Sequence, residues 1–120
     1  MEILLIVGKA LFGLLFVGSG IGHIKNVEAM IGYAQYKNLP FPKVGVLVSG
    51  VAIIAAPIFF VLGIFEVAAL ITLAVFLAAT AVIFHNYWTI EDPQTKMNEQ
   101  ISFNKNVALL GAVLVIITLL

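Results

Sequence analysis

The sequence predicts an all-α fold: an integral membrane four-helix bundle with short interfacial helices in its two long links. Two observations predict this class. Of the 120 residues, 62% are hydrophobic and only 10% are charged, whereas an average soluble domain has about 45–50% and 25%. The apolar residues also gather in four runs, each close to the roughly 20 residues that a helix needs to cross a bilayer. The runs cover residues 3–24, 44–62, 64–84 and 101–120. We therefore expect one domain over residues 1–120.

The composition excludes several classes of function. The chain has no Cys, which excludes disulfides, thiol catalysis and Cys-ligated metal clusters. Its formal net charge is zero, and no basic patch indicates a nucleic-acid partner. The sequence also contains no nucleophile triad, phosphate-binding loop or metal-ligand motif.

The first apolar run carries its polar residues on one helical face. Steps of three and four residues place the following side chains on that face: Lys9, Phe12, Phe16, Ser19 and His23, with Gly13 and Gly20 beside them. In lipid, a face of polar and small residues normally turns towards other protein. We therefore expect it to face the middle of the bundle. The run has no basic segment before it and exceeds the length of a signal core, so we expect a retained helix rather than a cleaved signal.

The link from His23 to Lys43 predicts a short helix lying in the membrane interface. Asn26 is a suitable N-cap, and apolar residues then recur at helical spacing beside Tyr and Lys, which suit the interface. Pro40 and Pro42 end this helix and begin the second span. An amphipathic linker and a lid over a site between the helices are both open interpretations.

The second and third runs predict a tight antiparallel hairpin, because the link around Gly63 is very short. Small residues in the second run permit close helix contact, and Pro57 removes a backbone hydrogen bond there. The third run extends from near Glu66 to His85. In the link over residues 86–106, we expect an interfacial aromatic anchor at positions 87 and 88 and a turn at positions 92 and 93.

The lysines predict the orientation of the chain in the membrane. Five of the six basic residues lie in the long links or at their ends: Lys25, Lys37, Lys43, Lys96 and Lys105. The positive-inside rule then places both long links in the cytoplasm and both termini outside. We expect a multi-pass protein of the plasma (inner) membrane of the cell.

Lys9 and Glu66 are candidates for an intramembrane charge pair at the outer end of the bundle. A lysine deep in a membrane helix costs about 2.5–3.5 kcal/mol, so it finds a partner or extends its side chain to the interface. A structural role and a role in holding an anionic or quinone ligand are both open.

A second set of polar residues gathers at the cytoplasmic ends of the spans. As a ligand-binding site we expect Ser19, His23, His85, Asn104, Lys105 and Asn106. Such side chains donate the hydrogen bonds that quinone carbonyls accept, and histidine suits proton transfer. The alternative is that these groups only cap helix ends or meet lipid headgroups. We expect no metal site, because neither histidine has a neighbouring carboxylate at its helix end.

Four segments together resemble the DoxX family of small bacterial and archaeal membrane proteins. They are KALFGLLFVGSGIGHI (residues 9–24), LPFP (39–42), HNYW (85–88) and FNKNVALLGAVL (103–114). The resemblance implies four transmembrane helices and a link to electron transfer, since some relatives are membrane subunits of a thiosulfate:quinone oxidoreductase. The family's basic residue in the first helix is carried here by Lys9. Its usual Glu near the start of the second span is absent, because Ser49 stands there.

We expect the protein to be a quinone-associated or accessory subunit of a membrane redox system, with quinone as the only indicated cofactor. Whether it takes part in catalysis is open. One alternative is a ligand-free scaffold that binds another membrane protein, and a second is a small-molecule permease. The expected partners are the lipid bilayer and a membrane or redox protein, and no nucleic acid. A homo-oligomer is also open.

Overall fold

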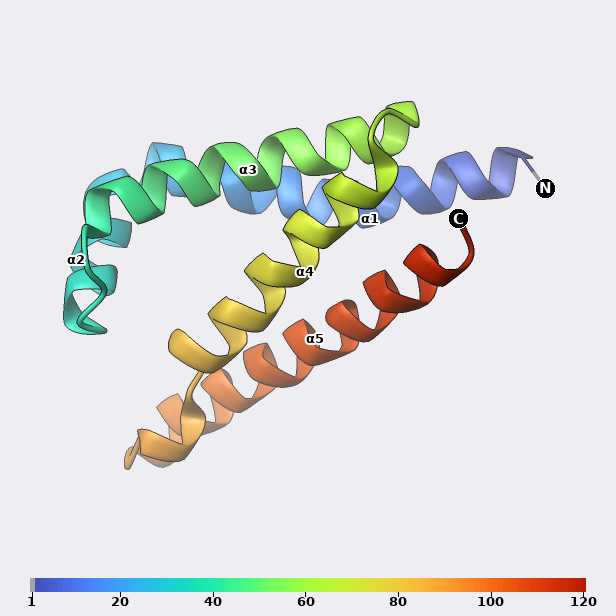
Figure 1. Ribbon diagram of the computed structural model, residues 1–120. Helices are drawn as coiled ribbons and strands as arrows, with labels where there is room; N and C mark the ends of the chain where they lie inside the picture. Colours follow the sequence, from blue (N-terminus) through green and yellow to red (C-terminus); the bar gives the residue numbers. More distant parts are fainter. Residues whose placement is uncertain (1) are drawn as a thin grey trace. The chain divides into compact units, whose positions relative to one another are not determined.

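The computed structural model describes residues 2–120, and in this range every regular element is helical (Figure 1). Four helices in the described range are long and apolar enough to cross a membrane. They are α1 (Glu2–Lys25), α3 (Pro42–Leu62), α4 (Glu66–Ile83) and α5 (Pro93–Thr118). Two short helices lie in the links, α2 (Val27–Tyr36) and η1 (Tyr87–Thr89). These findings confirm the predicted class, an all-α multi-pass membrane protein.

The described chain forms two compact units, residues 2–72 and residues 73–120. The boundary falls within α4, so this helix contributes to both units. The expectation of one domain over residues 1–120 stays a prediction.

In the first unit, α1 and α3 run side by side in opposite directions (Figure 1). Glycine permits this approach: a Cβ atom added to Gly20 of α1 would lie 2.8 Å from the carbonyl oxygen of Gly50 in α3. Further along the pair, Gly13 faces Pro57, and an added Cβ would lie 3.4 Å from the proline Cβ. Small residues therefore set how closely the two backbones pack.

Aromatic and branched side chains fill the rest of the contact between α1 and α3. Phe16 is only 2% exposed, and Ile53 is completely buried. The Phe12 ring lies 5.9 Å from the Phe60 ring in an edge-to-face arrangement, which is a favourable geometry for aromatic pairs. This contact is the core of the first unit.

The link between α1 and α3 is partly helical. Asn26 occupies the N-cap position of α2, but its side chain makes no capping hydrogen bond. Ala34 is fully buried where α2 packs on α3. The chain then reverses through Phe41, whose φ of 49° is left-handed, and α3 begins at Pro42.

The turn between α3 and α4 depends on glycine. Gly63 has a φ of 75° and caps α3 in the left-handed conformation, which glycine adopts without a steric penalty. Its N–H donates to the Phe60 carbonyl at 3.1 Å. Phe65 is also left-handed, with a φ of 49°, and α4 begins at the next residue. The turn brings Glu66 close to the end of α3.

In the second unit, α5 begins at Pro93, well before the apolar run that starts at Ile101. The Asp92 carboxylate accepts hydrogen bonds from the Thr95 hydroxyl at 2.7 Å and from the Thr95 backbone N–H at 2.9 Å. These two bonds hold the pKa of Asp92 below its usual value, because they stabilise the ionised carboxylate. Asp92 is thus the N-cap of a helix, with proline in its first turn.

Three aromatic rings join η1 to α5. Tyr87, Trp88 and Phe103 lie with their ring centroids 5.4 to 5.5 Å apart, in edge-to-face pairs. Such pairs stabilise a contact beyond the area they bury. The cluster fixes the start of α5 against the residues that follow α4.

Candidate functional site: an ion pair and a polar ladder in the membrane helices

The first polar site is an ion pair in the first unit. The Lys9 ammonium of α1 donates to Glu66 Oε1 of α4 at 3.0 Å, and their side chains are 16% and 27% exposed. The same ammonium donates to the Phe60 carbonyl at 3.3 Å and lies 4.8 Å from the centre of the Phe60 ring. Lys9 therefore connects α1 to the end of α3 and to the start of α4.

The partner of Lys9 comes from α4 and not from the start of α3. Ser49 of α3 donates its hydroxyl to the Val46 carbonyl at 3.2 Å. A serine that bonds to its own helix supplies no negative charge to a neighbour. Glu66, which follows the turn between α3 and α4, supplies the negative charge that Lys9 meets.

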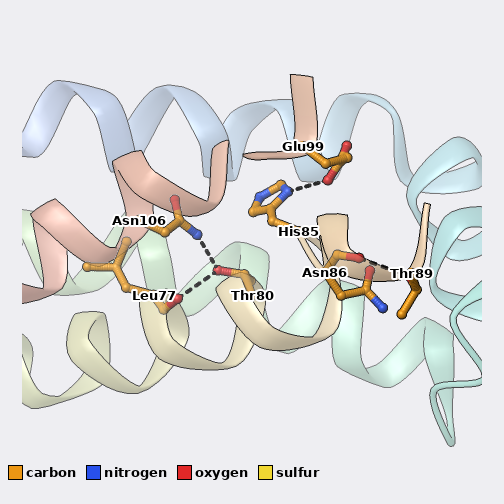
Figure 2. A network of polar contacts seen from close by, with 7 residues as sticks. All are labelled: Leu77, Thr80, His85, Asn86, Thr89, Glu99 and Asn106. Carbon is orange, nitrogen blue, oxygen red and sulfur yellow. Dashed lines mark hydrogen bonds and ion pairs between the residues drawn. The ribbon is translucent and has the colours of Figure 1, made fainter. Parts of the chain in front are cut away.

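The second polar site lies in the second unit and begins with a histidine–carboxylate pair. His85 Nδ1 lies 2.8 Å from Glu99 Oε2, and both side chains are half-buried (Figure 2). The expectation that no carboxylate lies beside a histidine was therefore wrong. Because α5 begins at Pro93, Glu99 belongs to this helix, and the helix places its carboxylate beside His85.

A buried amide continues the polar site along the helices. Asn106 of α5 is only 5% exposed, and its Nδ2 donates to the Thr80 hydroxyl at 2.8 Å (Figure 2). Thr80 in turn donates to carbonyls of its own helix, at Phe76 (2.8 Å) and Leu77 (3.3 Å). An amide buried among apolar side chains is costly unless it is hydrogen-bonded, so Asn106 fixes the contact between α5 and α4.

The two pairs form one ladder. The backbone N–H of His85 donates to the Thr80 carbonyl at 3.1 Å, so the residue that bonds Asn106 also holds the histidine. On α5, Glu99 and Asn106 are seven residues apart, which is about two turns and places them on one helix face. We call Thr80, His85, Glu99 and Asn106 the polar ladder.

The other predicted site residues are not members of the polar ladder. Asn104 and Lys105 are exposed on α5. Ser19 is exposed on α1 and its carbonyl lies 2.8 Å from His23 Nδ1, so that nitrogen donates, because a carbonyl only accepts. His23 and Ser19 belong to the first unit, and a site that they share with His85 stays a prediction.

Sequence reasoning missed Thr80 and Glu99. The signal for Glu99 was present: an Asp-Pro pair with a threonine at the third helical position predicts a helix start, and the helix then includes Glu99. The imidazole, carboxylate, hydroxyl and amide of the ladder suit hydrogen bonding and proton transfer. Among residues 2–120, no group of three or more His, Cys, Asp or Glu side chains could hold a metal ion.

Comparison with known proteins gives two matches. The model of a family described as DoxX matches residues 4–86, a range that includes Lys9, Glu66 and His85. Inner membrane protein YphA of Escherichia coli (strain K12) is 27% identical over 114 residues, which cover 95% of this chain and 81% of that protein. No solved structure gives a significant match to the chain.

Proposed function

Because the chain belongs to the DoxX family of membrane proteins, we propose that it is a quinone-binding subunit of a redox system in the inner membrane of the cell. The family membership confirms the resemblance noted from the sequence. The similarity to an inner membrane protein supports the membrane assignment. One observation carries the proposal: His85 and Glu99 lie 2.8 Å apart, beside the part-buried hydrogen bond between Thr80 and Asn106.

The ladder has the chemistry that a quinone requires. Quinone carbonyls accept hydrogen bonds, and a quinone takes up protons when it is reduced. Glu99 bonds His85 through Nδ1, which leaves Nε2 for a second partner. A protonated imidazole donates through Nε2 and can pass that proton to the group it bonds.

The surroundings of the ladder suit a flat apolar ring. Leu77 and Val113, which flank Thr80 and Asn106 along their helices, are almost completely buried. Phe103 lies on α5 between Glu99 and Asn106 and belongs to the aromatic cluster with Tyr87 and Trp88. Ligand sites typically combine apolar and aromatic walls with a few convergent polar groups.

The test is binding of a short-chain quinone to the purified full-length chain in detergent. We expect quinone to copurify, and His85→Gln and Glu99→Gln each to weaken affinity by about tenfold, the loss of one hydrogen bond to a charged group. Glu91→Gln is the matched control, because Glu91 is an exposed carboxylate just before α5. Unchanged affinity in both ladder variants would overturn the proposal.

The same material separates the alternatives. A scaffold would copurify with a membrane protein partner, keep that partner in both ladder variants, and bind no quinone. A permease would release a trapped solute from liposomes. For the redox subunit we propose a partner protein in the membrane that exchanges electrons with the bound quinone, and its capture should depend on neither ladder residue.

A further inference from the structure

A hollow in the first unit lies between α2 and the start of α3. Its volume is about 440 Å³, within the range of about 300–1,000 Å³ that ligand pockets span. The residues that matter for its chemistry are Glu28, Ile31, Gln35, Phe41, Lys43 and Val44. None of them belongs to the ion pair or to the polar ladder, so the hollow is a separate feature.

The hollow lies where lipid headgroups meet hydrocarbon. It is built by the link that joins two membrane-spanning helices, α1 and α3, and such a link stands at the membrane interface. The helix in this link, α2, combines Glu28 and Gln35 with apolar residues such as Ile31, a composition suited to that depth.

The two charges that line the hollow are of opposite sign. Glu28 and Lys43 both line it and both are exposed. The ion pairs found in the described part of the chain are Lys9–Glu66 and His85–Glu99, so neither Glu28 nor Lys43 takes part in one there. A carboxylate and an ammonium in one amphipathic hollow match a ligand that itself carries both charges.

We propose that this hollow binds a phospholipid whose headgroup carries a phosphate and a primary ammonium. Lys43 meets the phosphate, and Glu28 with Gln35 accepts hydrogen bonds from the ammonium. Ile31 and Val44 contact the first part of an acyl chain. An anionic headgroup without an ammonium would leave Glu28 facing like charge, and a choline headgroup has no N–H for Glu28 to accept.

The exposure of Phe41 also supports a lipid as the ligand. It is 80% exposed, and its φ of 49° is uncommon for a residue with a bulky side chain,. Exposure of such a ring to water is unfavourable, whereas at the membrane interface the ring contacts lipid. The inference does not rest on the quinone proposal, because the hollow and the ladder lie in different units.

The experiment uses a tryptophan at the hollow as a reporter in the full-length chain. In a Trp88→Phe background, Phe41→Trp is titrated in detergent with brominated phospholipids that carry ethanolamine, glycerol or choline headgroups. We expect saturable quenching, with the ethanolamine lipid binding about tenfold more tightly than the other two. Phe65→Trp is the matched control, because Phe65 has the same φ of 49° and is 76% exposed, but lines no hollow with paired opposite charges.

Charge variants of the reporter protein identify the contacts. Lys43→Gln should weaken the binding of all three lipids. Glu28→Gln should weaken the binding of the ethanolamine lipid and strengthen the binding of the glycerol lipid. Lys96→Gln and Glu91→Gln, at exposed charges outside the hollow, should change neither affinity nor order. Equal affinity for the three headgroups, or an unchanged order in Glu28→Gln, would overturn the proposal. Native mass spectrometry of the unaltered protein with a lipid mixture gives a second measurement, in which equal retention of the three lipids has the same meaning.

Discussion

At the scale of single residues, polar side chains placed deep in the spans have partners far along the sequence. Lys9 and Glu66 are 57 residues apart, and Thr80 and Asn106 are 26 apart. A charge or an amide in hydrocarbon is costly without a partner. Each pair therefore specifies one helix contact among many that apolar side chains alone would allow.

Removal of one member of the ion pair should destabilise the protein. For Lys9→Met, we expect the free energy of unfolding in detergent to fall by about 1–3 kcal/mol, because the variant leaves the Glu66 carboxylate half-buried without its partner. Lys9→Met combined with Glu66→Gln should recover much of this loss, since the uncompensated charge is then removed as well. Equilibrium unfolding of the two single variants and the double variant gives the coupling energy.

The control for this cycle is Lys105→Met, because Lys105 is an exposed lysine on α5. It should leave the unfolding free energy within about 0.5 kcal/mol of the original protein, as surface substitutions generally do. Losses that add independently in the double variant would show that the two charges do not interact in the folded protein.

The sequence indicates which residues need partners better than it indicates which partners they take. A lysine within an apolar run must be paired or reach the interface, so Lys9 is evident from the sequence, and Glu66 is a candidate partner because the turn at Gly63 is short. Hydropathy does not indicate Glu99, because this residue lies before the apolar part of its helix. Its proximity to His85 depends on where α5 begins, and hydropathy alone places that boundary too late.

At the scale of helices, glycine determines how α1 and α3 pack. Hydrophobic periodicity cannot identify the contact face of a membrane helix, because lipid and protein are both apolar. The polar stripe of α1 identifies Gly13 and Gly20 as inward-facing, and both are buried. The exposure of Ser19 on the same stripe is not evident from spacing, because it depends on how far the neighbouring helix covers that face.

Substitution at Gly20 should separate the two helices. A methyl group there would lie 2.8 Å from the Gly50 carbonyl oxygen and 3.1 Å from Ile53 Cγ1, and it would also meet Ile54. We expect Gly20→Ala to lower the unfolding free energy by about 1–3 kcal/mol, a usual cost of overpacking, and to lower the midpoint of thermal unfolding in detergent.

Gly22→Ala is the matched control, because a Cβ atom at Gly22 would meet nothing within 4 Å. It lies on the same helix and makes the same chemical change, so any effect on helix propensity is shared. Similar unfolding midpoints for the two variants would contradict the close contact at Gly20.

At the scale of the whole molecule, the charge distribution predicts its direction in the membrane. Lys37 lies between α1 and α3, Lys25 and Lys43 lie at the facing ends of these two helices, and Lys96 lies near the start of α5. The turn at Gly63 has no lysine. The number of membrane-spanning helices could be read from hydropathy, but orientation depends on the bilayer and on insertion, which leave no mark on the internal contacts.

Single cysteines report this orientation without interference, because the chain has no Cys of its own. We expect Asn38→Cys, between α2 and α3, and Met97→Cys, near the start of α5, to react with a membrane-impermeant thiol reagent only after the cell is opened. Ile64→Cys, in the turn between α3 and α4, should react in intact cells, because the positive-inside rule places this turn outside. Labelling of Ile64→Cys from the cytoplasmic side alone would contradict the predicted orientation.

The ion pair between Lys9 and Glu66 also has a consequence for biosynthesis. The two residues leave the ribosome 57 positions apart, which at 5–20 residues per second is a delay of about 3–11 s. During this interval α1 is already in the insertion machinery, while the Lys9 ammonium has no carboxylate partner. The pair can form only after α3 and the turn have emerged, so its formation marks the completion of the first unit.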